Sequence, residues 1–206
     1  MGASIDYYFI SASPFAYLGH QAFHSIAARR GTTIRYRPMK MLEVWEVSGS
    51  VPVAQRSPTR QRYRAIELQR LAEFRDLRLN LSPKHVPVDP TLADRTVIAL
   101  VEAGADPAGF LWQVHQGVWA LDHDIADRKT LATYLSEEGH DAEAALTFAE
   151  SPAAAAIHDA NTKDAIAADV IGAPAYVLNG EPFWGQDRLD HLDYALASAR
   201  PPFRPQ

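Results

Sequence analysis

The residues best suited to chemistry lie where a predicted strand gives way to a helix. Residues 5–11 are rich in aromatic and β-branched side chains, which is typical of a buried strand, and Ser13-Pro14 ends that pattern. Serine is a preferred N-cap and proline is favoured at the first helical position, so a helix should begin here. The Ser13 hydroxyl and the helix N-terminus can together stabilise an anion such as a thiolate, although Ser13 could also be only a cap.

The chain contains no cysteine. This excludes disulfides, a thiol nucleophile of the protein and cysteine-ligated metals, so sulfur chemistry at Ser13 needs a thiol from another molecule. A thiol with a pKa of about 8.5 is only about 3% ionised at pH 7, and lowering its pKa by about two units requires about 2.7 kcal/mol. A helix N-terminus and one charge-assisted hydrogen bond are together large enough to provide it.

A second candidate position is Pro174, in the segment "IGAPAYVLNG". Proline directly before a central strand conflicts with the hydrogen-bond ladder. A cis Ala173–Pro174 bond would resolve the conflict and leave the backbone of Ala173 free to pair with an extended ligand. A trans proline at the start of an edge strand is the alternative. In a sheet that brings the two positions together, Ser13, the first-turn amides and the edge of Ala173 form one site.

The elements that must position these residues lie at the two ends of the chain. The N-terminal half predicts strand, helix and strand over residues 5–11, 14–31 and 32–38. Near the C-terminus, Asn179-Gly180 between two short apolar runs predicts a hairpin, and residues 187–199 predict an amphipathic helix that starts near an acidic cap. The β-α-β and β-β-α halves are those of an α/β thioredoxin-like sheet.

The region between these halves has helical patterning almost throughout. It is interrupted by the proline-rich residues 79–90. We therefore expect a helical insertion domain at residues 59–169 and a thioredoxin-like domain formed by residues 1–58 and 170–206. Trp112 and Trp119 share a helix face and should fill the core or a dimer contact.

Net charge and hydropathy argue against several classes of partner and location. The net charge is -5 and the pI is near 5.9, which argues against nucleic acid or a polybasic membrane surface as a partner. No apolar run approaches the roughly 18 residues of a membrane span, and the first residues do not have the pattern of a targeting signal. We expect a soluble, cytoplasmic protein.

Two spacings on helix faces have less specific interpretations. His20 and His24 are four residues apart, as metal ligands can be, but no third ligand is evident and we predict no metal site. Arg56, Arg60 and Arg64 also recur at a spacing of four, and Arg64 at least should lie on a solvated face.

The two ends of the chain resemble a known family. The segments "DYYFISASPFAYLG" and "VIGAPAYVLNGEPFWGQDRLDHLDYAL" are similar to the 2-hydroxychromene-2-carboxylate isomerases, relatives of kappa-class glutathione transferases in the DsbA-like thioredoxin superfamily. "SVPVAQRSPTRQRYRAIELQRLAEF" and "SPKHVPVDP" are similar to bacterial members as well, so the resemblance covers nearly the whole chain.

The resemblance implies glutathione as a cofactor and a homodimer as the assembly. It implies that Ser13 hydrogen-bonds the sulfur and that the backbone of Ala173, before cis Pro174, pairs with the cysteinyl part. The remaining implied contacts are with the two ends of the tripeptide, the γ-glutamyl end at Gln186 and Asp187 and the glycyl carboxylate at Arg60. Many relatives have asparagine at the position of Ser50 and threonine at that of Ala175.

The implied reaction is isomerisation of 2-hydroxychromene-2-carboxylate to trans-o-hydroxybenzylidenepyruvate in aromatic-hydrocarbon breakdown. Candidate groups for this small aromatic carboxylate are cations for the anion and flat apolar side chains for the ring: Arg56, Lys84, His85, Phe15, Tyr17 and Trp184. Two alternatives remain. One is a kappa-class-like glutathione transferase that releases a conjugate, and the other is a non-catalytic DsbA-like binding protein.

Overall fold

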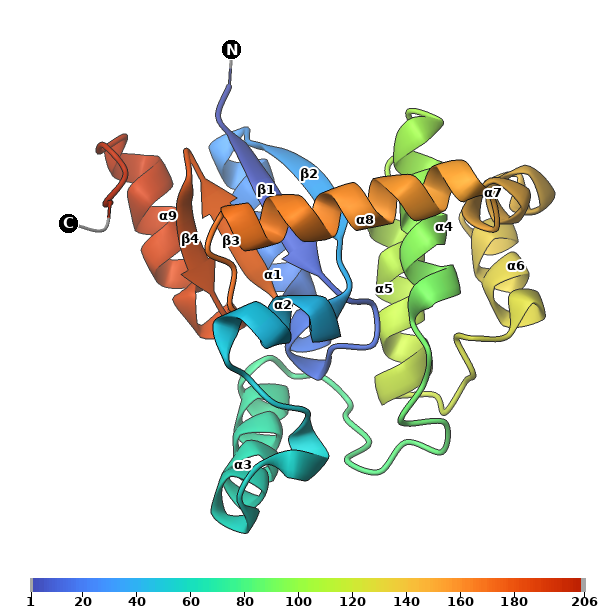
Figure 1. The fold of residues 1–206 in the computed structure, drawn as a ribbon, viewed down its shortest axis with the longest axis horizontal. Coiled ribbons are helices and arrows are strands. Elements are labelled where there is room, and N and C mark those ends of the chain that lie inside the picture. The colour runs from blue at the N-terminus through green and yellow to red at the C-terminus, as the bar shows by residue number, and fades with distance from the viewer. Residues whose placement is uncertain (1, 205–206) are drawn as a thin grey trace.

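A mixed four-stranded sheet forms the centre of the computed structural model, which describes residues 2–204 (Figure 1). The strand order is β2-β1-β3-β4, with β1 parallel to β2 and β3 antiparallel to both β1 and β4. The strands are β1 (Ser4–Phe9), β2 (Thr33–Pro38), β3 (Ala175–Leu178) and β4 (Glu181–Trp184). The two central strands therefore come from opposite ends of the chain.

Helix α1 (Pro14–Arg30) begins as the sequence predicts. The Ser13 hydroxyl accepts a hydrogen bond from the amide of Ala16 at 3.2 Å, and Pro14 occupies the first turn. Gly31 ends the helix in the left-handed conformation, with φ of 60°. The predicted β-α-β unit is confirmed.

The C-terminal β-β-α unit is also confirmed, with one difference. Asn179 and Gly180 both have positive φ, as a tight two-residue hairpin turn requires. The helix near the C-terminus, α9 (Leu189–Ser198), does not start near an acidic cap as predicted. Residues 186–188 form a short 3-10 turn instead, and the N-cap Arg188 makes no side-chain capping bond.

Helices cover both faces of the sheet (Figure 1). Alternation along β1 directs Tyr7 and Phe9 to the side of α1, and Tyr8 to the opposite side, where it packs with Met39 and Val44. The helices between the two halves of the sheet are α2 (Met41–Ser48), α3 (Pro58–Phe74), α4 (Thr91–Glu102), α5 (Ala108–Trp119), α6 (Arg128–Glu137), α7 (Ala142–Ala149) and α8 (Pro152–Ala167).

The helical character of residues 59–169 is confirmed, and α2 is an element that the sequence analysis missed. The division into a sheet domain and an insertion domain remains a prediction. One continuous apolar core joins the two parts, from Phe9 and Leu18 to Phe110 and Leu131. Trp119, 4% exposed, belongs to this core, as expected. No helix within residues 2–204 is both long and apolar enough to span a bilayer.

Gly19 marks a close approach between α1 and the segment after β4. An added Cβ at Gly19 would lie 2.6 Å from the Cβ of Gln186, closer than side chains tolerate. At Gly109, in the first turn of α5, an added Cβ would meet only the flexible carboxyl end of Glu138.

We predict that Gly19→Ala lowers the free energy of unfolding by about 1–2 kcal/mol, because overpacking outweighs the gain of up to about 1 kcal/mol in helix propensity. Gly109→Ala is the matched control, and its stability should be unchanged or higher. Urea unfolding of both variants measures the difference. Equal stability of the two variants would contradict the packing seen at Gly19.

Candidate active site

Ser13 lies in the turn between β1 and α1, and it is 6% exposed. Its Oγ accepts from the amide of Ala16, and its own amide donates to the carbonyl of Ile10 at 3.0 Å. The hydroxyl proton of Ser13 makes no hydrogen bond to another residue within 2–204, so the O–H remains able to donate to an acceptor. The site therefore combines a helix N-terminus with one available hydroxyl donor.

The Ala173–Pro174 peptide bond is cis, as predicted. The carbonyl of Pro174 accepts a hydrogen bond from the amide of Gly185 at 2.8 Å. By contrast, the amide and carbonyl of Ala173 make no hydrogen bond to any residue that the structure describes. Ala173 thus offers a free backbone edge. The Val86–Pro87 bond is also cis, which the sequence analysis did not predict.

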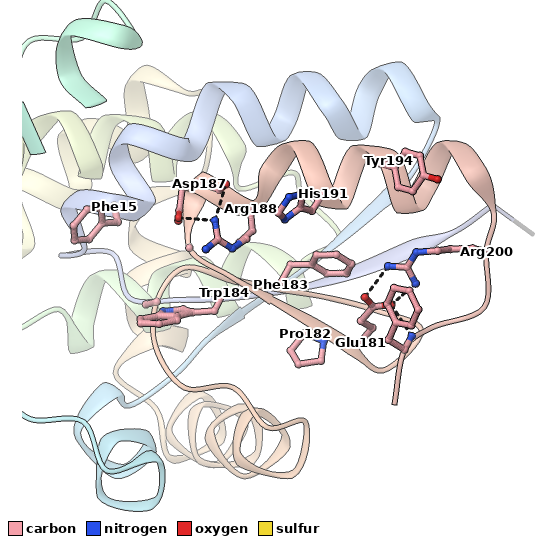
Figure 2. A pocket seen from close by; sticks show the side chains of 13 residues that line it. Phe15, Glu181, Pro182, Phe183, Trp184, Asp187, Arg188, His191, Tyr194 and Arg200 are labelled. Carbon is pink, nitrogen blue, oxygen red and sulfur yellow. Dashed lines mark hydrogen bonds and ion pairs between the residues drawn. The ribbon is translucent and has the colours of Figure 1, made fainter. Parts of the chain in front are cut away.

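A pocket of about 770 Å³ opens beside this edge (Figure 2). Phe15, Ala173 and Trp184 line one end, where the start of α1 meets the end of β4. The indole of Trp184 is half-exposed and lies so close to Gly172 that an added Cβ there would be 2.5 Å from its Nε1. Ser13 itself does not line the pocket, although Phe15, two residues later, does.

The expected pair Gln186-Asp187 is split by the structure. Asp187 lines the pocket, and its Oδ2 accepts from the guanidinium of Arg188 at 2.9 Å (Figure 2). Gln186 is 2% exposed, and its Oε1 accepts from Arg75 at 3.3 Å. Its side chain is thus directed into the protein and engaged there. Of the pair, Asp187 presents a side chain to the pocket.

Three arginines lie on or just before α3, and one of them contacts Phe15. The guanidinium of Arg64 lies 5.7 Å from the centre of the Phe15 ring. Burial lowers the pKa of Arg64 and of Arg56, and the neighbouring arginine charges, Arg56 and Arg60 respectively, lower them further. None of the three forms an ion pair within residues 2–204. The expectation that Arg64 is solvated is wrong, because it is half-buried against the aromatic ring.

The other expected substrate contacts lie away from the pocket. Tyr17 is 1% exposed, stacks on Trp112 with ring centres 5.4 Å apart, and donates its hydroxyl to the carbonyl of Arg78. Its burial therefore speaks against a role in an apolar wall. The backbone amide of Lys84 donates to Asp122, and the imidazole of His85 lies 3.7 Å from Asp124, so this loop is tied to the α5–α6 connection.

The far wall of the pocket was missed by the sequence analysis. It is built by β4, α9 and the segment that follows α9 (Figure 2). At this end, Arg200 donates two hydrogen bonds to Glu181, each 2.7 Å long. The lining residues there are Glu181, Pro182, Phe183, Gly185, Arg188, His191, Tyr194, Arg200 and Phe203. The apolar periodicity of α9 identifies its buried face but gives no signal for a pocket on the other side.

The two histidines with metal-ligand spacing belong to a cluster of three imidazoles. His20 and His24 stack with ring centres 4.0 Å apart, and His115 lies 5.4 Å from His20. No group of three or more metal-binding side chains occurs in the described part of the chain. Burial lowers the pKa of His20 and His24, and it lowers the pKa of the fully buried His115 to about 3. This cluster is neutral at pH 7.

We predict that His115→Leu reduces the fall in the free energy of unfolding that accompanies a decrease in pH. The pKa of His115 in the folded state lies below the value of 6.5 for a free histidine, so its neutral form stabilises the fold above pH 6.5 and this stability is lost as the pH falls. At pH 5 the loss from His115 is about 2 kcal/mol. The measurement is the free energy of unfolding in urea at pH 7.5 and at pH 5.

The variant should lose about 2 kcal/mol less than the wild type between these two pH values. His140→Leu, outside the core, should keep the wild-type difference. An identical loss in all three proteins would show that the burial of His115 does not govern its protonation.

Comparison with known proteins identifies the fold. Residues 4–197 match the family described as DSBA-like thioredoxin domain. The solved structure of a 2-hydroxychromene-2-carboxylate isomerase superposes with a TM-score of 0.79 and 28% identity, covering 95% of each chain. A probable DsbA oxidoreductase from Streptomyces coelicolor, 18% identical, has a TM-score of 0.70 over 99% of this chain and 94% of that one, and this likeness supports the fold alone.

Curated relatives share one name. A 2-hydroxychromene-2-carboxylate isomerase from Pseudomonas putida is 31% identical over 196 residues, which cover 93% of each chain. A protein of the same name from Sphingobium xenophagum is 29% identical over 198 residues, covering 95% of this chain and 99% of the relative. These matches confirm the DsbA-like thioredoxin fold and the resemblance found in the sequence.

Proposed function

Because the chain belongs to the DsbA-like thioredoxin family and, within it, to the 2-hydroxychromene-2-carboxylate isomerases, we propose that it is a glutathione-dependent isomerase. The proposed reaction converts 2-hydroxychromene-2-carboxylate to trans-o-hydroxybenzylidenepyruvate in aromatic-hydrocarbon breakdown. The observation that carries the proposal is a serine donor at a helix N-terminus, in a chain without cysteine, near a free backbone edge at Ala173.

The residues present fit glutathione. The O–H of Ser13 can donate to its sulfur. The amide and carbonyl of Ala173, beside Pro174, have no hydrogen-bond partner among the described residues and can pair with the cysteinyl backbone of glutathione. Asp187 offers a carboxylate to the γ-glutamyl ammonium, and Arg60, in the first turn of α3, offers a cation to the glycyl carboxylate. When bound, glutathione would supply a thiol whose reversible addition makes a rigid double bond rotatable.

The chain's own residues provide the ionising and orienting environment. The positive N-terminus of α1 contributes about 0.3–1 kcal/mol toward an anion near Ser13. A hydrogen bond from the Ser13 hydroxyl to a charged acceptor contributes a further 1.5–3 kcal/mol or so. Phe15 and Trp184 present apolar faces for an aromatic substrate, and Arg64, beside Phe15, offers a cation for its carboxylate. Arg56, which lies over Trp45, is the second candidate cation. A homodimer and a cytoplasmic location remain predictions.

The activity is tested with purified protein and the chromene acid. We expect conversion only when glutathione is present, and a product with the same mass as the substrate, because isomerisation gains and loses no atoms. Product formation is followed by absorbance and mass spectrometry. Full activity after removal of glutathione would reject the cofactor, and a persistent conjugate would indicate a transferase. Binding of peptides but not of millimolar glutathione would indicate a non-catalytic protein.

The role of Ser13 can be separated from simple capping. Ser151 starts α8 in the same way as Ser13 starts α1: each precedes a proline, and each accepts from the third following amide at 3.2 Å. Replacing either serine by alanine should cost about 1 kcal/mol of stability. Ser13→Ala alone should also raise the pKa of bound glutathione's thiol by about one to two units, through loss of a charge-assisted hydrogen bond.

The measurement is the thiolate absorbance of bound glutathione as a function of pH, which has no background from protein thiols because the chain has none. Glutathione affinity should remain mostly intact in Ser13→Ala, and Ser151→Ala should titrate like the wild type. If Ser13→Ala and Ser151→Ala give the same thiol pKa, Ser13 is only a cap.

A further inference from the structure

A fully buried carboxyl group from the helical region reaches the turn that carries Ser13. Oδ1 of Asp94, in the first turn of α4, accepts a hydrogen bond from the amide of Ser11 at 2.8 Å. Both residues are 0% exposed, and 83 positions separate them in the chain. Ser11 lies between the end of β1 and Ser13, so this bond ties α4 to the candidate site.

The rest of the Asp94 carboxyl is poorly compensated. Its Oδ2 and the Oγ of Ser11 have no hydrogen-bond partner among the residues that the structure describes. A neighbouring titratable group is His158 on α8, whose Nε2 lies 4.0 Å from Oδ2, and no lysine or arginine pairs with Asp94 within residues 2–204. Burying an apolar side chain at this position would cost less free energy than burying a carboxyl group. Stability alone therefore does not explain a carboxyl group here.

Burial raises the pKa of Asp94 to about 7, against the opposing effect of Ser11, and the charge of Asp89 raises it further. Burial, with Arg95 and Lys40 as smaller causes, lowers the pKa of His158 to about 4. Of this pair, Asp94 alone changes charge near neutral pH. The charged groups around the pair are Asp89, Arg95, Lys40 and Asp159.

We propose that Asp94 is a positioning residue that holds the β1–α1 turn through its hydrogen bond with Ser11. When its carboxyl group is ionised, Asp94 destabilises an anion bound at Ser13 by charge repulsion. Ser11 and Ser13 are at most about 7 Å apart along the chain. Because Asp94 Oδ1 lies 2.8 Å from the Ser11 amide, its charge is within about 10 Å of the Ser13 turn. A like charge at that distance shifts the pKa of an anionic group by on the order of one unit. The effect on an anion rests on the function proposed above, while the hold on Ser11 does not.

The first experiment needs no ligand. The full chain is labelled with ¹⁵N-serine, and the Ser11 amide, assigned from its absence in Ser11→Ala, is followed by NMR from pH 5.5 to 8.5. In the wild type this amide should shift in one step centred near pH 7 as its acceptor ionises. In Asp94→Asn, which keeps an acceptor oxygen but cannot ionise, the step should vanish.

Glu102→Gln, which also replaces a carboxylate by an amide but at the other end of α4, should keep the step. A wild-type Ser11 amide with no step would overturn the proposal without reference to any variant. A step that persists in Asp94→Asn would overturn it as well.

The second experiment follows the pH dependence of the glutathione-dependent isomerase. The acidic limb of kcat/KM should move to lower pH in Asp94→Asn, by less than one pH unit because Asp94 is itself only partly ionised over this range, and should stay in place in Glu102→Gln. A purely structural role would lower the rate at every pH and leave the limb where it was, which contradicts the proposal. If the wild type shows no glutathione-dependent activity, the proposed function fails, and the Ser11 titration still decides the role of Asp94.

Discussion

One electrostatic constraint underlies the proposed function: a chain without a thiol has to keep another molecule's sulfur ionised at the first turn of a helix. The requirement is about 2.7 kcal/mol, the free energy of a two-unit fall in thiol pKa. The N-terminus of α1 alone is too weak, since it supplies up to about 1 kcal/mol in ordinary settings. The hydroxyl of Ser13 can supply the remaining free energy. It caps the helix with a lone pair, so its proton stays available to donate to an anionic acceptor.

The fold brings this environment together from distant parts of the chain. The parallel pairing of β1 with β2 fixes where α1 begins, and the antiparallel entry of β3 beside β1 brings Ala173 to the same end of the sheet. The helical region contributes twice, through Arg64 against Phe15 and through Asp94 on the amide of Ser11. The insertion therefore supports the site as well as covering the sheet.

Local sequence signals predict the elements well and the walls of the site poorly. The Ser13-Pro14 cap, the Asn179-Gly180 turn and the cis proline are encoded by neighbouring residues, and all are confirmed. The burial of Tyr17 and Gln186, the partly buried Arg64 and the link from Asp94 depend on which helices pack together. Spacing along one helix shows which residues share a face but does not show what that face meets.

The most direct test of the central claim is the pKa of glutathione's thiol when bound to the wild-type chain, read from thiolate absorbance between pH 5 and 10. The account predicts a bound thiol that is half-ionised near pH 6.5, about two units below the ordinary value for a thiol. A bound thiol that titrates near pH 8.5 would mean that Ser13 and the first turn of α1 do not stabilise the anion.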